Sequence, residues 1–105
     1  MKIAIATINK KEDSKISSRG GRAPYFLIFN ENGELLESVS NPFAIGGGGA
    51  GISVAQMLAD KKVDVVVAEV IGGNMRSALE ERGVKYYEKR GVAKEIVQEI
   101  IDLGE

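Results

Sequence analysis

The sequence predicts a single α/β domain, residues 1–105, with the element order β-β-β-α-β-α-β-α. The run VDVVVAEV at Val63–Val70 is almost continuously apolar and β-branched, which is typical of a strand covered on both faces. Apolar residues at helical spacing over Ala93–Ile101 indicate an amphipathic final helix. Strands alternate with helices in the second half, and such crossovers add parallel strands to a sheet. We therefore expect a five-stranded mixed sheet flanked by helices.

Three strands are expected in the first half. Lys2–Ile8 (KIAIATI) suits a buried strand, and the polar segment Asn9–Ser18 should form an exposed loop. Tyr25–Phe29 (YFLIF) is the second strand. Asn30–Gly33 (NENG) supplies turn residues, since Asn and Gly tolerate positive φ. Glu34–Ser40 then pairs back as a hairpin.

The second half begins with a glycine-rich loop and continues with helices on either side of strands. Ile52–Lys61 should form a helix with Ile52, Ala55 and Leu58 or Ala59 on one side. The next helix is expected to have Asn74 as its N-cap and Gly83 just beyond its end. Val84–Tyr87 is a short last strand.

The composition excludes several chemistries. The chain has neither His nor Cys, so it cannot build the usual zinc, copper or haem sites. Catalytic triads and cysteine nucleophiles are excluded as well. We expect no catalytic residues and no protein-ligated metal, so that a transition metal would arrive inside a preformed cofactor.

The charge balance gives no sign of a nucleic-acid or membrane partner. Fourteen basic residues offset fifteen acidic ones, for a net charge of −1. Met1 leads directly into alternating Ile and Ala, and no apolar run approaches the ~20 residues of a membrane span. We expect a cytoplasmic protein.

Three loops should meet at the carboxyl ends of the parallel strands, where open α/β sheets bind ligands. They are Asn9–Arg22, Ala44–Ser53 and Ile71–Met75. Glycines in these loops can expose backbone N–H groups, and two arginines add positive charge, so an anionic ligand is favoured. The candidate binding residues are Arg19, Gly20, Gly21, Arg22, Gly47, Gly48, Gly49, Ser53, Gly72, Gly73 and Asn74.

Interpretations without an anion-binding site are also open for these loops. Each could be a surface loop without a ligand. Gly46, Gly48 and Gly51 match the dinucleotide pattern G-x-G-x-x-G, with Glu69 as the acidic residue, but a run of glycines matches it by chance. The glycines also lack the Lys-Ser/Thr of a phosphate-binding P-loop. Glu69 is placed as a catalytic carboxylate would be, and pairing with an arginine is the favoured interpretation.

Two segments carry a family resemblance: ISSRGGRAPYFLIF at 16–29 and VDVVVAEVIGGNMRSALEERGVK at 63–85. With the strand MKIAIAT they resemble the dinitrogenase iron–molybdenum cofactor biosynthesis family, which includes NifX-like, NafY-like and NifB C-terminal domains. The likeness covers nearly the whole chain. It implies a ribonuclease H-like motif with sheet order 3-2-1-4-5. It also implies a non-catalytic accessory protein that binds or carries iron–molybdenum cofactor or an iron–sulfur cluster precursor, with a cofactor-biosynthesis protein as a partner.

One motif departs from the family. Members often have His-Phe-Gly where this chain has Arg19-Gly20-Gly21, so metal ligation from that position is lost. Arg19 can still meet an anionic cofactor through its charge. Ribonuclease H chemistry needs clustered carboxylates, one of them on the first strand, and KIAIATI contains none. The alternative functions are a protein-interaction module and a small-anion or nucleotide-binding domain without a role in nitrogenase.

Overall fold

The computed structural model describes residues 1–46 and 48–104 and confirms the predicted element order. The elements are β1 (Lys2–Thr7), β2 (Tyr25–Asn30), β3 (Leu35–Ser40), α1 (Ala50–Asp60), β4 (Val65–Ala68), α2 (Gly73–Glu81), β5 (Lys85–Glu88) and α3 (Ala93–Asp102). The sheet order is β3-β2-β1-β4-β5, as the family resemblance implied. Strand β2 runs in the direction opposite to the other four strands. The other four strands therefore end at one edge of the sheet, which we call the carboxyl edge.

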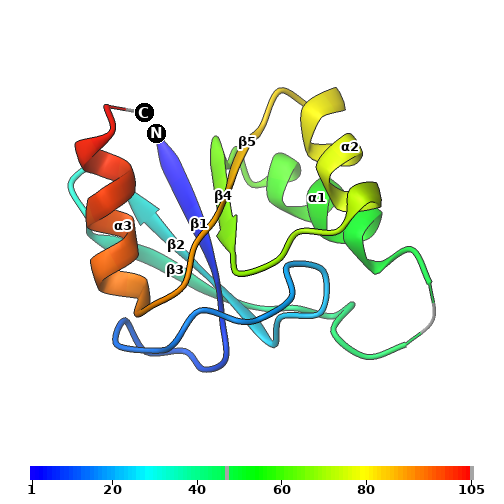
Figure 1. The fold of residues 1–105 in the computed structure, drawn as a ribbon, viewed down its shortest axis with the longest axis horizontal. Coiled ribbons are helices and arrows are strands. Elements are labelled where there is room, and N and C mark those ends of the chain that lie inside the picture. The colour runs from blue at the N-terminus through cyan, green and yellow to red at the C-terminus, as the bar shows by residue number, and fades with distance from the viewer. Residues whose placement is uncertain (47, 105) are drawn as a thin grey trace.

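Helices cover both faces of the sheet. Helices α1 and α2 lie on one face and α3 on the other (Figure 1). The alternation along β1 matches these layers, since Ala4 and Ala6 join the α1–α2 cluster while Ile3 and Ile5 join the α3 cluster. All of β4 is buried between β1 and β5. The β-branched run therefore forms a strand covered on both faces, as predicted.

The hairpin turn between β2 and β3 forms where the Asn-Gly pattern predicts it. The side-chain carbonyl of Asn30 accepts the backbone N–H groups of Asn32, at 2.9 Å, and Glu34, at 3.0 Å. Gly33 has a φ of 80°, a conformation that glycine adopts without steric cost. Local side-chain bonds and one glycine thus fix the register of the hairpin.

Helix α1 differs from the prediction at its start. It begins at Ala50 rather than Ile52, and the first turn packs Gly51 against α2. Of the predicted apolar side, Ala55 and Leu58 are buried as expected, but Ile52 is 47% exposed, so its inclusion in that side is wrong. The inner side is formed by Val54, Ala55 and Leu58.

Helix α2 also begins earlier than predicted. Its N-cap is Gly72, and Asn74 lies within the first turn, so the predicted cap at Asn74 is wrong. Gly83, with a φ of 70°, follows the C-cap Arg82 and ends the helix as expected. No helix in residues 1–46 and 48–104 combines the length and apolar character needed to cross a membrane.

The loop after β1 is less exposed than its polar sequence suggests. Ser14, Ile16 and Ser17 are buried. The N–H of Ile16 donates to the carbonyl of Gly91 at 2.9 Å, and the N–H of Ser17 donates to that of Ala6 at 2.8 Å. Backbone pairing satisfies the polar groups, so a polar sequence lies partly inside.

Candidate functional site

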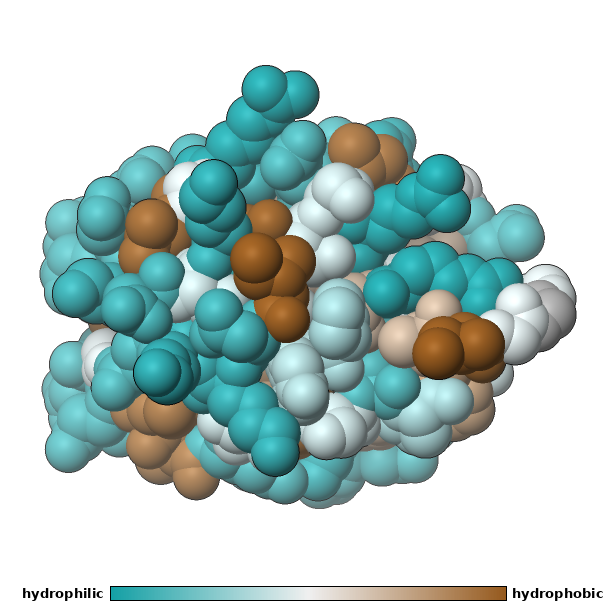
Figure 2. Space-filling view, turned by 90° about the horizontal axis from the view of Figure 1, so that it is seen from below, coloured by the Kyte–Doolittle hydropathy of each residue, from teal (hydrophilic) through white to brown (hydrophobic). Residues whose placement is uncertain are grey.

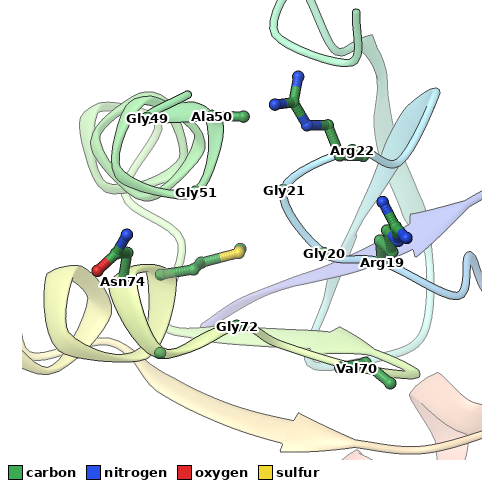
Figure 3. Close-up of a pocket in the computed structure, with 12 residues that line it drawn as sticks. Arg19, Gly20, Gly21, Arg22, Gly49, Ala50, Gly51, Val70, Gly72 and Asn74 are labelled. Carbon is green, nitrogen blue, oxygen red and sulfur yellow. The ribbon is translucent and has the colours of Figure 1, made fainter. Parts of the chain in front are cut away.

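Three segments meet at the carboxyl edge and enclose a cleft of about 370 Å³. They are the RGGR loop (Arg19–Arg22), the first turn of α1, and the IGGN segment (Ile71–Asn74) that leads into α2. Figure 3 shows the RGGR loop facing the first turns of both helices. The cleft is lined by Arg19, Gly20, Gly21, Arg22, Gly49, Ala50, Gly51, Val70, Gly72, Gly73, Asn74 and Met75. Its volume lies at the lower end of the ~300–1,000 Å³ of small-molecule sites.

Backbone hydrogen bonds attach the RGGR loop to the end of β4. The N–H of Gly20 donates to the carbonyl of Val70 at 2.9 Å, and that of Val70 donates to Ser18 at 3.1 Å. On the other side, the buried amide of Asn41 donates to the carbonyls of Gly21, at 3.2 Å, and Ala23, at 2.9 Å. The loop is therefore fixed at both ends and holds one wall of the cleft.

The two arginines of the loop have different surroundings. The Arg22 guanidinium donates to the carbonyl of Gly46 at 3.0 Å and to that of Phe43 at 3.4 Å. In Figure 3 this side chain extends from the loop toward the start of α1. Arg19 is exposed at the rim of the cleft. Arg22 therefore ties the RGGR loop to the loop that precedes α1, whereas Arg19 can turn its guanidinium toward a ligand.

Both helices present uncapped N-termini to the cleft. No described side chain caps the N-cap residues Gly49 and Gly72. The first intrahelical bonds are Ser53 N–H to Gly49 and Arg76 N–H to Gly72. The N–H groups before them have no partner within their helix, and neither first turn contains an acidic residue. Two helix dipoles and their free N–H groups therefore favour an anion at this place.

The glycines of the site fall into two groups. A Cβ on Gly51 would lie 2.9 Å from Cβ of Met75, and one on Gly20 would lie 3.0 Å from its Sδ. These glycines allow the three segments to pack closely. A Cβ on Gly49, Gly72 or Gly73 would meet no atom within 4 Å, so these positions leave open space.

The structure brings most of the predicted residues together, but not all. Gly48 and Ser53 line a separate shallow hollow of about 120 Å³ beside Phe43. Gly47 lies outside the described residues. The list of candidate binding residues did not include Ala50, Gly51, Val70 and Met75. Ala50, Gly51 and Met75 lie within the three predicted loops, whereas Val70 belongs to the predicted strand, which ends at Ala68 in the structure.

No carboxylate of the described residues lines the cleft. Glu69 Oε1 lies 3.4 Å from the Arg90 guanidinium, so the arginine pairing expected for Glu69 is confirmed. Asp64 accepts the backbone N–H of Lys2 at 2.9 Å, at the opposite end of the sheet. Within residues 1–46 and 48–104, no three carboxylates gather as a metal site would need. Strand β3 ends at Ser40 and α1 begins at Ala50, unlike the tight strand–helix turn of a dinucleotide site.

Comparisons with solved structures show that the fold is shared. The apo form of the orange protein from Desulfovibrio gigas is 27% identical, with a TM-score of 0.87 over 96% of this chain and 87% of that chain. A Thermotoga protein provisionally named a NifB protein is 31% identical, with a TM-score of 0.81 and the same coverage of 96% and 87%. A provisionally assigned dinitrogenase from Methanocaldococcus jannaschii is 19% identical, with a TM-score of 0.68 over 97% of this chain and 88% of that chain, and shows the fold alone.

The sequence matches a family model over residues 1–103, and that family is described as dinitrogenase iron-molybdenum cofactor. No curated protein matches the sequence significantly. Because the match spans nearly the whole chain, this protein belongs to the dinitrogenase iron–molybdenum cofactor family.

Proposed function

We propose that this protein is a non-catalytic carrier that binds an anionic metal cofactor, an iron–molybdenum-type cluster or its precursor, in the cleft at the carboxyl edge. The observation that carries the proposal is the convergence of two uncapped helix N-termini and an exposed arginine on one cleft. The family description names the cofactor, and the orange protein structure is of an apo form, a word that implies a ligand-bound form.

The residues of the cleft suit a metal cluster whose metal atoms are already coordinated by the cluster's own sulfides. The chain has no His or Cys, so an incoming cluster would keep its sulfides. Arg19 would supply charge at the rim, and the N–H groups at the start of α2 would donate hydrogen bonds to the cluster. The open space at Gly72 and Gly73 lets a ligand approach the backbone. Binding without covalent ligation also allows release without displacing a thiolate.

Titration with tetrathiomolybdate, a small anionic molybdenum–sulfur complex, tests this proposal. We expect saturable binding that weakens with salt, and Arg19→Gln should weaken it by about tenfold, the loss of one charge-assisted hydrogen bond of about 1.4 kcal/mol. Gly73→Leu should weaken binding more than Arg19→Gln does, because the leucine side chain would fill the cleft. Calorimetry and the shifts of backbone amides give the affinity and the location.

The matched control is Lys62→Gln, which removes one positive charge from an exposed position at the opposite end of the sheet. It should leave the affinity unchanged. Equal weakening by Lys62→Gln and Arg19→Gln would indicate general attraction of anions and would contradict a site. Absence of binding to extracted iron–molybdenum cofactor as well would refute the carrier function.

A second candidate, a protein-interaction module, is favoured by apolar side chains near the cleft. Ile45 is 93% exposed and Val70 is 54% exposed, and Ile8 follows β1 at the same edge. Figure 2, which views the molecule from the side of this edge, shows separate hydrophobic patches among polar and near-neutral residues. A partner that co-elutes with the ligand-free protein and is lost on Ile45→Asp would favour this function.

A further inference from the structure

The position of the IGGN segment depends on one pair of charged side chains. Glu88 of β5 and Arg76 of α2 form an ion pair of 3.0 Å, and both also bind the backbone of Ile71. Glu88 Oε2 accepts the N–H of Ile71 at 2.8 Å, and Arg76 Nε donates to its carbonyl at 2.9 Å. Both backbone groups of the residue before Gly72 are therefore held by side chains.

This arrangement differs from an ordinary surface ion pair. Exposed ion pairs contribute little to stability because water screens the charges, and both pairs lie at the surface: Arg90 of the Glu69–Arg90 pair is 85% exposed with the ions 3.4 Å apart, and Arg76 and Glu88 are 46% and 38% exposed. In the Arg76–Glu88 pair each ion is also tied to a main-chain group, and bonds to charged groups are the stronger ones. The Ile71 bond and the Arg76 guanidinium together lower the pKa of the Glu88 carboxyl. The carboxylate form is thus the one that holds Ile71.

The pair lies where it affects the cleft. The Ile71 side chain is buried in the core, and the two residues after it are the open glycines of the cleft. Glycines without side chains have no packing contacts of their own to hold their orientation, so their direction depends on the residues on either side. Arg76, one turn into α2, and Glu88 on β5 fix Ile71, the residue before these glycines, between a helix and a strand.

We propose that Arg76 and Glu88 are positioning residues of the binding site: they hold Ile71 so that the N–H groups of Gly73 and Asn74 point into the cleft. Neither side chain lines the cleft, so both act through the backbone. The inference rests on the proposed function only for the identity of the ligand.

The sign of the change in anion affinity when Glu88 is removed distinguishes a positioning role from a purely electrostatic one. Removing a carboxylate near an anion site should strengthen anion binding if charge alone matters. We expect Glu88→Ala to weaken the binding of tetrathiomolybdate by about tenfold instead, because the IGGN segment loses its anchor. Arg76→Lys keeps the charge but lacks the two-pronged contact, and should weaken binding similarly. The matched control Glu69→Ala breaks the Glu69–Arg90 ion pair and should bind as tightly as the wild type or slightly more tightly.

Amide spectra of the ligand-free protein provide a readout that does not depend on the ligand. Glu88→Ala should accelerate hydrogen exchange at Ile71 and shift the amides of Gly72, Gly73 and Asn74, whereas Glu69→Ala should leave them in place. Folded Glu88→Ala protein with unchanged amides, or with affinity equal to or above the wild type, would overturn the inference. If the wild type does not bind the probe, the proposed function fails, and the amide spectra alone decide the positioning role.

Discussion

At the scale of single residues, glycine performs two different tasks in this site. Gly51 and Gly20 lie against Met75, where a side chain would collide with α2. Gly72 and Gly73 have open space and no positive φ, so their backbone does not require glycine. Substitution of Gly51 should therefore lower stability, whereas substitution of Gly73 should affect ligand binding without lowering stability.

Gly51→Ala and Gly73→Ala provide this comparison in the first turns of α1 and α2. Alanine gains about 1 kcal/mol of helix propensity at Gly51, but overpacking in a close contact costs about 1–3 kcal/mol, so we expect a net loss of about 1 kcal/mol. Gly73→Ala should stabilise the protein by about 0.5 kcal/mol. Urea unfolding measures both. A stabilised Gly51→Ala variant would show that α1 and α2 can move apart without cost.

At the scale of elements, the site lies at the carboxyl ends of the strands, and its walls are attached to the central strand β4. Strand β4 is buried on both faces and paired with β1 and β5, and the IGGN segment follows directly from it. The RGGR loop is hydrogen-bonded to the same strand end through Val70. Two walls of the cleft therefore depend on one strand, and damage to β4 should destroy fold and site together.

Val66→Asp tests the central role of β4. The carboxylate would be buried without a partner, at a cost of several kcal/mol against a total stability of about 5–15 kcal/mol, and we expect an unfolded protein. Val70→Asp, the same substitution at a half-exposed position two residues beyond the strand, should remain folded. Circular dichroism distinguishes the two outcomes. A folded Val66→Asp protein would contradict the assignment of β4 as a doubly covered strand.

At the scale of the whole molecule, composition limits what the protein can hold. All 105 positions lack His and Cys, and the described residues bring no cluster of carboxylates together. The polar groups of the described residues that line the cleft include the two arginines, the side-chain amide of Asn74 and backbone N–H groups. The arginines and N–H groups favour a ligand that accepts hydrogen bonds, and the absence of His and Cys means that a cluster would have to bring its own metal ligands.

Elemental analysis after extensive dialysis provides the corresponding test. The ligand-free protein should retain no stoichiometric zinc, copper or iron, because borderline and soft metals are held in proteins by imidazole or thiolate ligands. Addition of zinc salts should leave the melting temperature unchanged. A stoichiometric transition metal that survives dialysis in protein without bound cluster would contradict this prediction.

The sequence alone determined the element order, the doubly covered strand and the absence of His and Cys. These features rest on local signals: the β-branched run at Val63–Val70, the turn residues at Asn30–Gly33, and residue counts. It also indicated which loops share an edge, because strand direction follows from the order of strands and crossovers. Eight of the eleven predicted site residues line the cleft: Arg19, Gly20, Gly21, Arg22, Gly49, Gly72, Gly73 and Asn74.

Only the tertiary structure decided how these residues differ in their surroundings. Whether a glycine allows close packing, as Gly51 does, or leaves space, as Gly73 does, depends on a neighbour distant in sequence. The same holds for the arginines, since the carbonyls that bind Arg22 come from a different loop. The pairing of Glu88 with Arg76 and Ile71 joins β5, α2 and the IGGN segment, and no local pattern encodes it. Local sequence fixes which backbone conformations are favourable, whereas side-chain contacts across elements exist only after the chain has packed.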